Sequence, residues 1–413
     1  MRLFDDKGKK YNNQLKYNLT MHPSEELRGS KGSDLSGKKI ILGVTGSIAA
    51  VECVKLVREL IREGAEVHCV ISDWGSKIIH PNSLEFASGN EVITELTGKV
   101  EHVSHCGNVP DKADIFLIAP ATANTISKMA KGIDDTPVTT FATTCVGSDI
   151  PIMVVPAMHQ TMYHHPIVMD NLEELQEKLN VTVVGPKIEE GAAKVAERDQ
   201  IVDSVIRELN YDLEGEKITV ITGRTIEPID SMRVVTNRAT GKSGLELAKR
   251  AYRKGADVEL WYGDVKGDIP HWIPNRSFET LDDLFEMSSG LKGTVIVPAA
   301  LSDFSPEKVK EKKISSSESL TLQLEPTKKF IDRIKEDVEF LIAYKAEDTR
   351  DGAVERAEQM IEDGRADIVI ANSLDDVEIE ENRVYITGEN EWVEGSKRKI
   401  AERIMERLKE ELR

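Results

Sequence analysis

The chain has 413 residues and a formal net charge of −18 at pH 7, a length that predicts two or more domains. The acidic balance, without a dominant basic block, argues against nucleic acid and anionic membranes as partners. No apolar stretch approaches the length of about 18 residues that a membrane helix needs, the N-terminus lacks the apolar core of a signal peptide, and the four cysteines form no CxxC pair. We therefore expect a reduced, cytoplasmic protein.

The first half of the chain has the pattern of an α/β domain. Residues 1–36 are polar and predict a partly ordered arm. In residues 37–209, short apolar runs alternate with segments of helical periodicity, which is typical of a parallel sheet with helices on both faces. Strands are expected near Ile40–Leu42, Glu66–Ile71, Ile115–Ala119 and Ile152–Val155, followed by a helix at Gln200–Leu209.

The first strand ends in a turn that can bind phosphate. Apolar residues recur at helical spacing from Ile48 to Ile61 directly after Gly46 and Ser47, and Gly64 supplies a stop. This order places backbone N–H groups where a phosphate can bind. The turn matches neither GxGxxG nor a Walker loop, so a mononucleotide fits it better than a dinucleotide or a nucleoside triphosphate. An ordinary strand–helix turn is the alternative.

The second half repeats this pattern after a linker at 210–215. Its strands are expected at Lys217–Thr222, Thr294–Val297, Phe340–Tyr344 and Asp367–Ala371, with a hairpin near Arg383–Thr387 and a charged C-terminal helix. Gly46 and Gly64 are 18 residues apart, whereas Gly223 and Gly255 are 32 apart, so this half carries 14 additional residues, which we place in its first strand–helix connection. Such a long polar connection is typical of a functional loop. We predict two tandem Rossmann-like domains, the second at 216–413.

Three loops of the first domain carry candidate functional residues. His80 precedes a proline and should therefore lie in an extended loop. It is a candidate general base, and a histidine that only faces solvent is the alternative. Asn82 or Ser83 should cap a short helix that ends at Gly89.

The other two loops follow the third and fourth strands. Within Ala119–Thr125, Thr122 and Asn124 can hydrogen-bond a flat ligand or cap a helix, and the two roles are compatible. The loop Pro156–Met162 is either a ligand contact or a strand–helix turn with a core methionine.

In this order, the three loops and the Gly-Ser turn resemble the flavoprotein cysteine decarboxylases over about residues 37–200. The resemblance implies a flavodoxin-like domain that binds FMN, with its phosphate near Gly46 and Ser47 and further contacts from Ser72 and Thr122. It implies redox-assisted loss of CO2 from a cysteinyl group, for which the flavin supplies the difficult chemistry.

The resemblance also implies that His80 is the catalytic base and that Asn124 binds the substrate carboxylate, with substrate contacts from Met158, His159 and Met162. His159 stands where this family usually carries Asn, and its functional equivalence is open.

A second departure concerns the proton donor of the final step. The stretch Gly191–Ala196 lacks the cysteine that reprotonates the enethiolate in decarboxylases of this pathway. Another residue would then donate that proton, with Cys145 as one candidate, or the final reduction differs.

Motifs of the second half resemble phosphopantothenate–cysteine ligase. They are Thr222–Asp230, Arg233, Asn237, Gly241–Gly244, Ala299–Phe304, Lys313-Ile314 and Asp367–Asn372. A Walker loop is excluded for Gly241–Gly244, since Thr236 occupies the position of its first glycine.

The resemblance implies CTP and Mg²⁺: the substrate carboxylate attacks the α-phosphate, pyrophosphate leaves, and the amine of cysteine attacks the acyl-cytidylate. Asp303 matches the acidic position that contacts nucleotide and metal, and Ala299 and Tyr344 fall at nucleotide-contacting positions. Lys313 matches the lysine that neutralises charge during activation, and Asn237 matches the residue that orients the acyl intermediate.

Two alternatives concern the lysines of this domain. Lys313 also fits a solvated member of the run Lys308–Lys313. Two lysines that bacterial ligases carry before the Asp-Ile-Val-Ile strand are missing, and Lys345 or Arg365 is the candidate substitute. The choice between CTP and ATP therefore stays open.

Together these features predict a bifunctional enzyme of coenzyme A synthesis. It would ligate 4′-phosphopantothenate to cysteine and then decarboxylate phosphopantothenoylcysteine to 4′-phosphopantetheine. The resemblance also suggests a homo-oligomer, with trimers joined by dimers into a dodecamer. An NAD-linked oxidoreductase is disfavoured because GxGxxG is missing, and a non-catalytic flavin- or nucleotide-binding regulatory subunit is the other alternative. His102, His105 and Cys106 lack a fourth ligand at zinc spacing, so we interpret them as structural.

Overall fold

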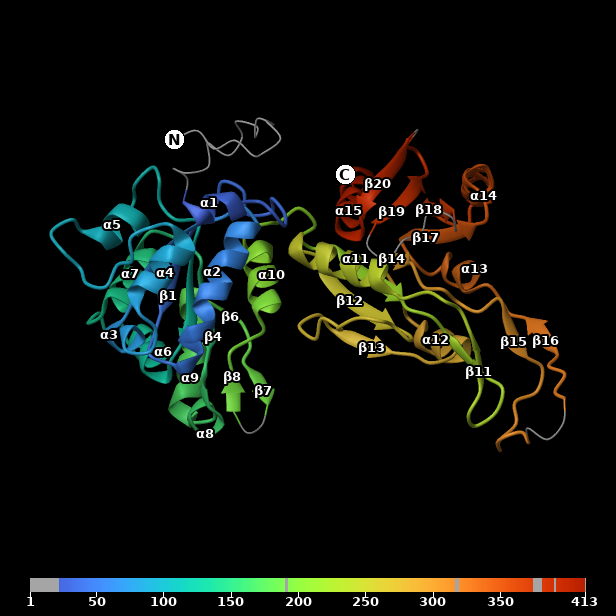
Figure 1. The fold of residues 1–413 in the computed structure, drawn as a ribbon, viewed down its shortest axis with the longest axis horizontal. Coiled ribbons are helices and arrows are strands. Elements are labelled where there is room, and N and C mark those ends of the chain that lie inside the picture. Colours follow the sequence, from blue (N-terminus) through green and yellow to red (C-terminus); the bar gives the residue numbers. More distant parts are fainter. Residues whose placement is uncertain (1–21, 190–191, 316–318, 374–380, 390, 413) are drawn as a thin grey trace, which may run out of the picture. The chain divides into compact units, whose positions relative to one another are not determined.

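The computed structural model describes residues 22–189, 192–315, 319–373, 381–389 and 391–412. These residues form two compact units, one that ends at Leu209 and one that begins at Asn210, coloured from blue to green and from yellow-green to red in Figure 1. In the described part of the chain, no helix has the length and apolarity needed to cross a membrane. Each unit has its own parallel sheet.

Unit 1 is built on a parallel sheet with the strand order β2-β1-β3-β4-β6, which is the flavodoxin-like order. Its strands are β1 (Lys39–Val44), β2 (Glu66–Ile71), β3 (Ile115–Ala121), β4 (Ile152–Pro156) and β6 (Thr182–Val183). Strand β6 was not predicted, because its two residues are too short for a periodic pattern. A small antiparallel sheet holds β5 (Met158–His159), β7 (Lys187–Glu189) and β8 (Ala192–Lys194).

Helices cover both faces of this sheet. They are α1 (Pro23–Leu27), the 3₁₀ helix η2 (Ile48–Glu52), α2 (Cys53–Arg62), α3 (Asp73–Ser76), α4 (Pro81–Ser88), α5 (Glu101–Cys106), α6 (Ala123–Ala130), α7 (Pro137–Gly147), α8 (Gln160–Tyr163), α9 (Pro166–Leu179) and α10 (Arg198–Glu208). Helices α2, α4 and α10 share one core with Ile40 and Leu42, whereas α6, α7 and α9 share the opposite core with Ile41. The apolar run at 40–42 is therefore uninterrupted because both of its faces are buried.

Two regions of unit 1 differ from expectation. Residues 22–36, which the sequence analysis assigned to the polar arm, fold onto unit 1, where Leu35 is fully buried and its N–H donates to the carbonyl of Glu63. The predicted apolar stripe after Ser47 is wrong in its first turn, because Ile48 is 75% exposed and Val51 is 49% exposed. A 3₁₀ turn precedes α2 and rotates these two side chains off the core face.

Unit 2 has the Rossmann strand order β13-β12-β9-β14-β17-β18, followed by the antiparallel strands β19 and β20. The strands of this sheet are β9 (Lys217–Thr222), β12 (Asp257–Tyr262), β13 (Asn275–Ser277), β14 (Thr294–Val297), β17 (Phe340–Glu347), β18 (Ile368–Ser373), β19 (Glu381–Ile386) and β20 (Trp392–Ser396). The two predicted Rossmann-like sheets are confirmed.

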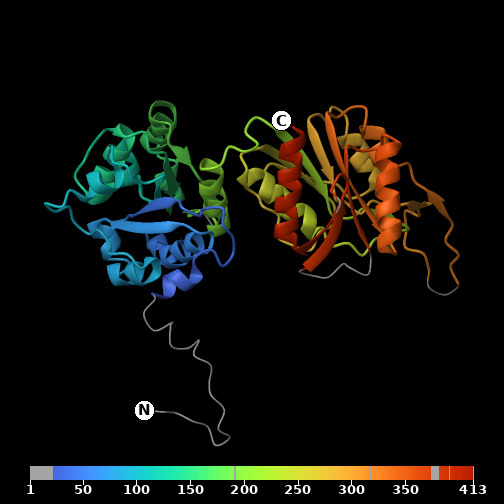
Figure 2. The ribbon, with the colours of Figure 1, turned by 90° about the horizontal axis from the view of Figure 1, so that it is seen from above.

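The helices of unit 2 also form two layers, seen edge-on in Figure 2. They are α11 (Lys242–Arg253), α12 (Leu281–Met287), α13 (Phe330–Ile334), α14 (Arg350–Glu362) and α15 (Lys397–Glu411). Helices α11 and α15 pack on one face, and α12, α13 and α14 pack on the other.

The 14 additional residues lie in the first strand–helix connection of unit 2. They form the antiparallel pair β10 (Ile226–Pro228) and β11 (Val234–Thr236). A second antiparallel pair, β15 (Phe304–Pro306) and β16 (Leu324–Pro326), lies against β10. These two ribbons stand apart from the sheet (Figure 1).

Candidate active sites

Loops that follow β1, β2 and β3 are tied together at one edge of unit 1. The hydroxyl of Thr45 donates to the carbonyl of Pro120 at 2.6 Å and accepts the N–H of Thr122 at 3.1 Å. The N–H of Ser72 donates to the carbonyl of Val44 at 3.0 Å. These bonds gather the loops at the carboxyl ends of β1 and β3, where the strand order reverses and where open α/β sheets bind ligands.

The turn at Gly46 and Ser47 is tight. A Cβ atom at Gly46 would lie 2.4 Å from Cβ of Trp74, so any other residue would displace α3. Ser47 has extended backbone geometry before η2, and in the described residues its hydroxyl makes no capping bond. The Ser47 hydroxyl and the first N–H groups of η2 therefore fit a phosphate.

Ser72 and Thr122 have the same local role. Each begins a helix, since the hydroxyl of Ser72 accepts the N–H of Gly75 at 3.2 Å and the hydroxyl of Thr122 accepts the N–H of Thr125 at 3.3 Å. A hydroxyl that accepts such a bond keeps its own hydrogen for donation. Both hydroxyls can thus cap a helix and bind a ligand at once.

His80 itself caps α4, which corrects the expectation that Asn82 or Ser83 does so. Its Nδ1 accepts the N–H of Asn82 at 3.2 Å, because the adjoining proline holds His80 extended with its side chain turned over the helix start. This bond favours the neutral tautomer that carries its proton on Nε2. The side chain is exposed, and the helix ends at Gly89, as predicted.

The loop after β4 adjoins the other three. The N–H of Ala157 donates to the carbonyl of Ala121 at 3.1 Å, which places Met158 and His159 beside the loop after β3. Nδ1 of His159 accepts the N–H of Thr161 at 3.3 Å and lies 2.8 Å from the Thr161 hydroxyl, so His159 caps α8.

Asparagine, which the resemblance implies at this position, is among the best N-cap residues, so either side chain can begin this helix. Met162 is 50% exposed, and Asn124 is also exposed.

The stretch Gly191–Ala196, in which the family's proton-donating cysteine is missing, contains strand β8, and β8 pairs with the Pro156–Met162 loop. Strand β8 is antiparallel to β5, with Ala192 opposite His159 and Ala193 opposite Met158. Gly191, which belongs to the same stretch, lies outside the described residues.

The cysteines do not fit the role of donor. Cys145 is fully buried, and the neighbouring Cys106 and burial both raise the pKa of its thiol. Burial likewise raises the pKa of Cys69 to about 12.

The histidines near Cys106 fit the structural interpretation. Burial lowers the pKa of His105 to about 4, and its ring lies 4.8 Å from that of His68. Among the described residues, no group of three or more His, Cys, Asp and Glu side chains could hold a metal ion.

Unit 2 contains a cavity of about 880 Å³ where its strand order reverses, between β9 and β14. Asn237, Ala299, Asp303 and Tyr344 all line this nucleotide-sized cavity. Lys313 does not belong to its lining and is exposed in the connection between β15 and β16.

The cavity is strongly cationic. Among the described residues that line it, eight are basic and one is acidic. The basic residues are Arg238, Lys242, Lys328, Lys329, Lys345, Arg356, Arg365 and Lys397. Such an excess in a chain of net charge −18 favours a polyanionic ligand.

Of these basic residues, only Lys242, Lys345 and Arg365 stand in or near motifs that the sequence alone singles out. The other five come from four separate segments of the chain, so no motif in chain order groups them.

Hydrogen bonds hold Asn237 against the loop after β14. Its Nδ2 donates to the carbonyl of Ala300 at 2.9 Å and to that of Leu301 at 3.3 Å. Its own carbonyl accepts Nη1 of Arg224 at 2.8 Å, and Arg224 pairs with Asp264. Asn237 is therefore fixed at the cavity wall, which suits a residue that orients a reacting group.

Asp303, the expected metal contact, and Arg365, a candidate substitute for a missing lysine, both form ion pairs with neighbouring side chains. Asp303 is exposed and pairs with Lys329. Arg365 binds Asp332 with two nitrogens, at 2.8 and 3.1 Å. A divalent cation at Asp303 would compete with Lys329 for the carboxylate.

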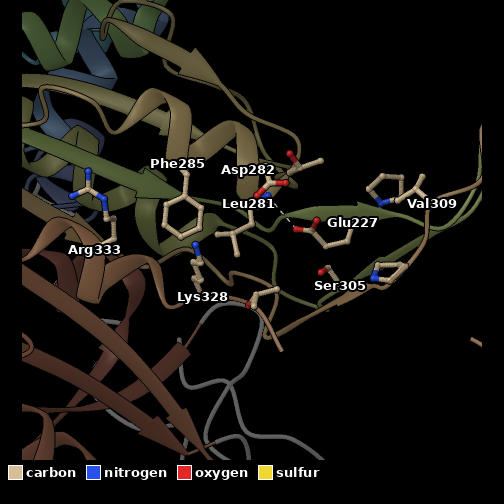
Figure 3. Close-up of a pocket in the computed structure, with 12 residues that line it drawn as sticks. Glu227, Leu281, Asp282, Phe285, Ser305, Val309, Lys328 and Arg333 are labelled. Atoms are coloured by element: carbon tan, nitrogen blue, oxygen red, sulfur yellow. Dashed lines mark hydrogen bonds between the residues drawn. The ribbon is translucent and has the colours of Figure 1, made fainter. Parts of the chain in front are cut away.

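A second cavity, of about 620 Å³, shares Thr327 and Lys328 with the first. Figure 3 shows Phe285 and Leu281 toward one side of its lining, and Glu227 between Leu281 and Val309. Oε1 of Glu227 accepts the N–H of Leu281 at 3.1 Å, and burial raises the pKa of Glu227.

Comparison with known proteins identifies relatives of both units. The Flavoprotein family model matches residues 28–210, and the model of the DNA/pantothenate metabolism flavoprotein C-terminal domain matches residues 213–412. The chain is 46% identical to the coenzyme A biosynthesis bifunctional protein CoaBC of Thermococcus kodakarensis, over 95% of this chain and 100% of that protein. It is 38% identical to the corresponding protein of Methanocaldococcus jannaschii, over 94% of this chain and 98% of that protein.

A solved structure of the C-terminal domain of a CoaBC protein aligns with 49% of this chain and 98% of that domain, at 25% identity and a TM-score of 0.41. The resemblance predicted from the motifs is confirmed by the relatives that span both units. This chain belongs to the CoaBC family of bifunctional coenzyme A biosynthesis proteins.

Proposed function

We propose that unit 2 joins 4′-phosphopantothenate to cysteine with CTP, and that unit 1 decarboxylates the resulting phosphopantothenoylcysteine to 4′-phosphopantetheine with FMN. One observation carries this proposal: most motif residues of each half gather where the strand order of its sheet reverses.

In the ligase reaction, the basic lining of the large cavity holds the nucleotide phosphates, and Asp303 contacts the nucleotide and Mg²⁺. The substrate carboxylate displaces pyrophosphate from the α-phosphate, and the amine of cysteine then displaces CMP from the acyl-cytidylate. Asn237 orients the acyl group for that attack. Lys313, on the connection after β15, neutralises charge while the carboxylate is activated.

In the decarboxylase reaction, bound FMN supplies two-electron redox chemistry. Gly46, Ser47, Ser72 and Thr122 bind and orient this cofactor through backbone N–H groups and hydroxyls. Asn124 and the Met158–Met162 loop bind the substrate.

His80 accepts a proton from the substrate thiol in this scheme. Because Nδ1 accepts the N–H of Asn82, Nε2 carries the ring proton, so proton uptake breaks the capping bond in either case: directly at Nδ1, or at Nε2 after the proton has moved to Nδ1.

A homo-oligomer in the cytoplasm is part of the proposal. Ile48, Val51 and Trp74 are exposed by 75%, 49% and 68% beside the proposed cofactor site. On the ribbons of unit 2, Met232 and Phe304 are exposed by 71% and 50%. Exposed apolar groups of this kind favour subunit contacts, consistent with trimers joined by dimers. Four buried free cysteines favour a reducing compartment.

An anaerobic assay with purified protein tests the function. Pyrophosphate release over many turnovers should require CTP, phosphopantothenate and cysteine together, because the amine of cysteine must consume each acyl-cytidylate, and CO2 should follow in preparations that carry FMN. Replacing CTP by ATP decides the nucleotide. Binding of FMN or CTP with no turnover at all would instead favour the non-catalytic regulatory subunit, and NAD-dependent oxidation would favour the oxidoreductase.

A further inference from the structure

The smaller cavity of unit 2 carries charges of both signs. Among the described residues that line it, two are acidic, Glu227 and Asp282, and two are basic, Lys328 and Arg333. The large cavity has eight basic residues and one acidic residue in its described lining. A lining with both signs in equal number fits a zwitterion, whereas the large cavity fits a polyanion.

Glu227 is buried, whereas the other three charged residues of the smaller cavity are exposed. It reaches the cavity from β10, and its Oε1 accepts the N–H of Leu281, at the start of α12, at 3.1 Å (Figure 3). Burial, together with the charges of Asp282 and Asp283, raises the pKa of its carboxyl group. A carboxylate with a raised pKa takes up a proton more readily near neutral pH, which suits a general base.

The two cavities adjoin at a shared wall. Thr327 and Lys328 line both of them. The hydroxyl of Thr327 donates to the carbonyl of Ser302, which also lines the large cavity, at 2.6 Å. Arg333 pairs with Asp337 at 2.8 Å, whereas Lys328 forms no ion pair within the described part of the chain. The ammonium group of Lys328 can therefore bind an anionic group of a ligand at this wall.

A chain of contacts connects Glu227 to the residue that orients the acyl group. Nδ2 of Asn237 donates to the carbonyl of Leu301 at 3.3 Å. The next residue, Ser302, donates its N–H to the hydroxyl of Thr225 at 2.9 Å. Thr225 is fully buried and lies two residues before Glu227. Glu227 is therefore held at a fixed place relative to Asn237.

Cysteine is the zwitterion among the three substrates of the proposed ligase, since CTP and 4′-phosphopantothenate are polyanions. Its α-amino group, with an ordinary pKa of about 8, is mainly protonated at pH 7. An ammonium nitrogen has no lone pair, so it must lose a proton before it attacks an acyl carbon. The ligase therefore needs a base where cysteine binds.

We propose that the smaller cavity binds cysteine, with Glu227 accepting a proton from its ammonium group and Lys328 binding its carboxylate. This inference rests on the proposed ligase function. The neutral amine attacks the acyl carbon of the acyl-cytidylate, a C–N bond forms, and the C–O bond to the phosphate breaks. CMP leaves with that electron pair, and its phosphate takes the second proton from the nitrogen.

Two measurements on the full-length protein separate the half-reactions. Exchange of labelled pyrophosphate into CTP, with 4′-phosphopantothenate and without cysteine, reports the formation of the acyl-cytidylate. Rapid-quench measurement of CMP release, after cysteine is added to the preformed acyl-cytidylate, reports its consumption. Glu227→Gln keeps an oxygen for the N–H of Leu281 but cannot act as a base. It should release CMP about a hundredfold more slowly, while pyrophosphate exchange stays at the wild-type rate.

Glu286→Gln is the matched control, because Glu286 is exposed on α12 and does not belong to the described lining of the cavity. Equal rates of CMP release in these two variants overturn the role of Glu227. A loss of pyrophosphate exchange in Glu227→Gln as large as its loss of CMP release also overturns that role, since Glu227 would then serve the first half-reaction. Absence of exchange in the wild-type protein with both CTP and ATP overturns the proposed ligase function itself.

Cysteamine, which is cysteine without its carboxylate, tests the role of Lys328. The wild-type protein should use cysteine with a kcat/KM about ten- to hundredfold above that for cysteamine, the effect of one hydrogen bond to a charged group. Lys328→Met should bring this ratio close to one. The ratio cancels any effect of Lys328 on the nucleotide in the large cavity. An unchanged ratio in Lys328→Met overturns the carboxylate contact.

Discussion

Gly46→Ala should damage the cofactor site of unit 1 without affecting unit 2. The new Cβ would lie 2.4 Å from Cβ of Trp74, 3.2 Å from its carbonyl carbon and 3.4 Å from its Cα. The shortest of these distances is about 1 Å below a normal carbon–carbon contact. Neither a backbone atom nor a Cβ can rotate away, so α3 must shift, at a cost of about 1–3 kcal/mol in the free energy of unfolding of unit 1.

The shift would move the Ser72 loop, which carries the start of α3, away from the turn. Purified Gly46→Ala protein should therefore contain little FMN, measured by absorbance near the flavin bands, while CTP-dependent pyrophosphate release stays at the wild-type level. Gly98→Ala is the control, because nothing lies within 4 Å of a Cβ built there. A Gly46→Ala protein with the stability and flavin content of Gly98→Ala would refute the reasoning.

Three further variants test other parts of the structure. His159→Ala should cost about 1 kcal/mol in urea unfolding of unit 1 while His159→Asn stays within about 0.5 kcal/mol, and equal losses would contradict the capping role. The N–H of Ile314 donates to the carboxylate of Asp230, and this bond is the main cause that holds the pKa of Asp230 well below its ordinary value. The carboxylate therefore stabilises unit 2 above the ordinary carboxyl pKa of about 3.9, and this stabilisation is lost as the pH falls below that value. The stability difference between the wild-type protein and Asp230→Asn should thus shrink below about pH 4, and a pH-independent difference would contradict the stabilising role of this carboxylate. The variant should also lose roughly tenfold in ligase kcat, because Ile314 positions Lys313. Asn237→Ala should lower ligase kcat/KM about a hundredfold and leave CO2 release unchanged, and comparable losses in both assays would point to misfolding instead.

Elements that depend on a local pattern could be predicted from the sequence. The apolar runs, the Thr-Gly turns and the long connection after β9 follow from periodicity and turn chemistry, which act over a few residues. It failed where burial depends on distant partners. Leu35 is an isolated apolar residue in a polar stretch, and it is buried because it joins the core that α2, α4 and α10 share. Ile48 and Val51 fit a helical stripe, but the 3₁₀ turn directs them outward.

The sequence by itself determined the two-domain α/β architecture, the family resemblance and most of the candidate residues, because strand periodicity and short motifs are encoded in neighbouring positions. Only the tertiary structure decided which charges share a cavity and which histidine nitrogens are occupied. Lys242 and Lys397 are separated by more than a hundred residues and line one cavity because α11 and α15 pack against each other on one sheet face. His80 and His159 became helix caps because backbone direction after each strand, rather than residue type alone, sets where a side chain can reach.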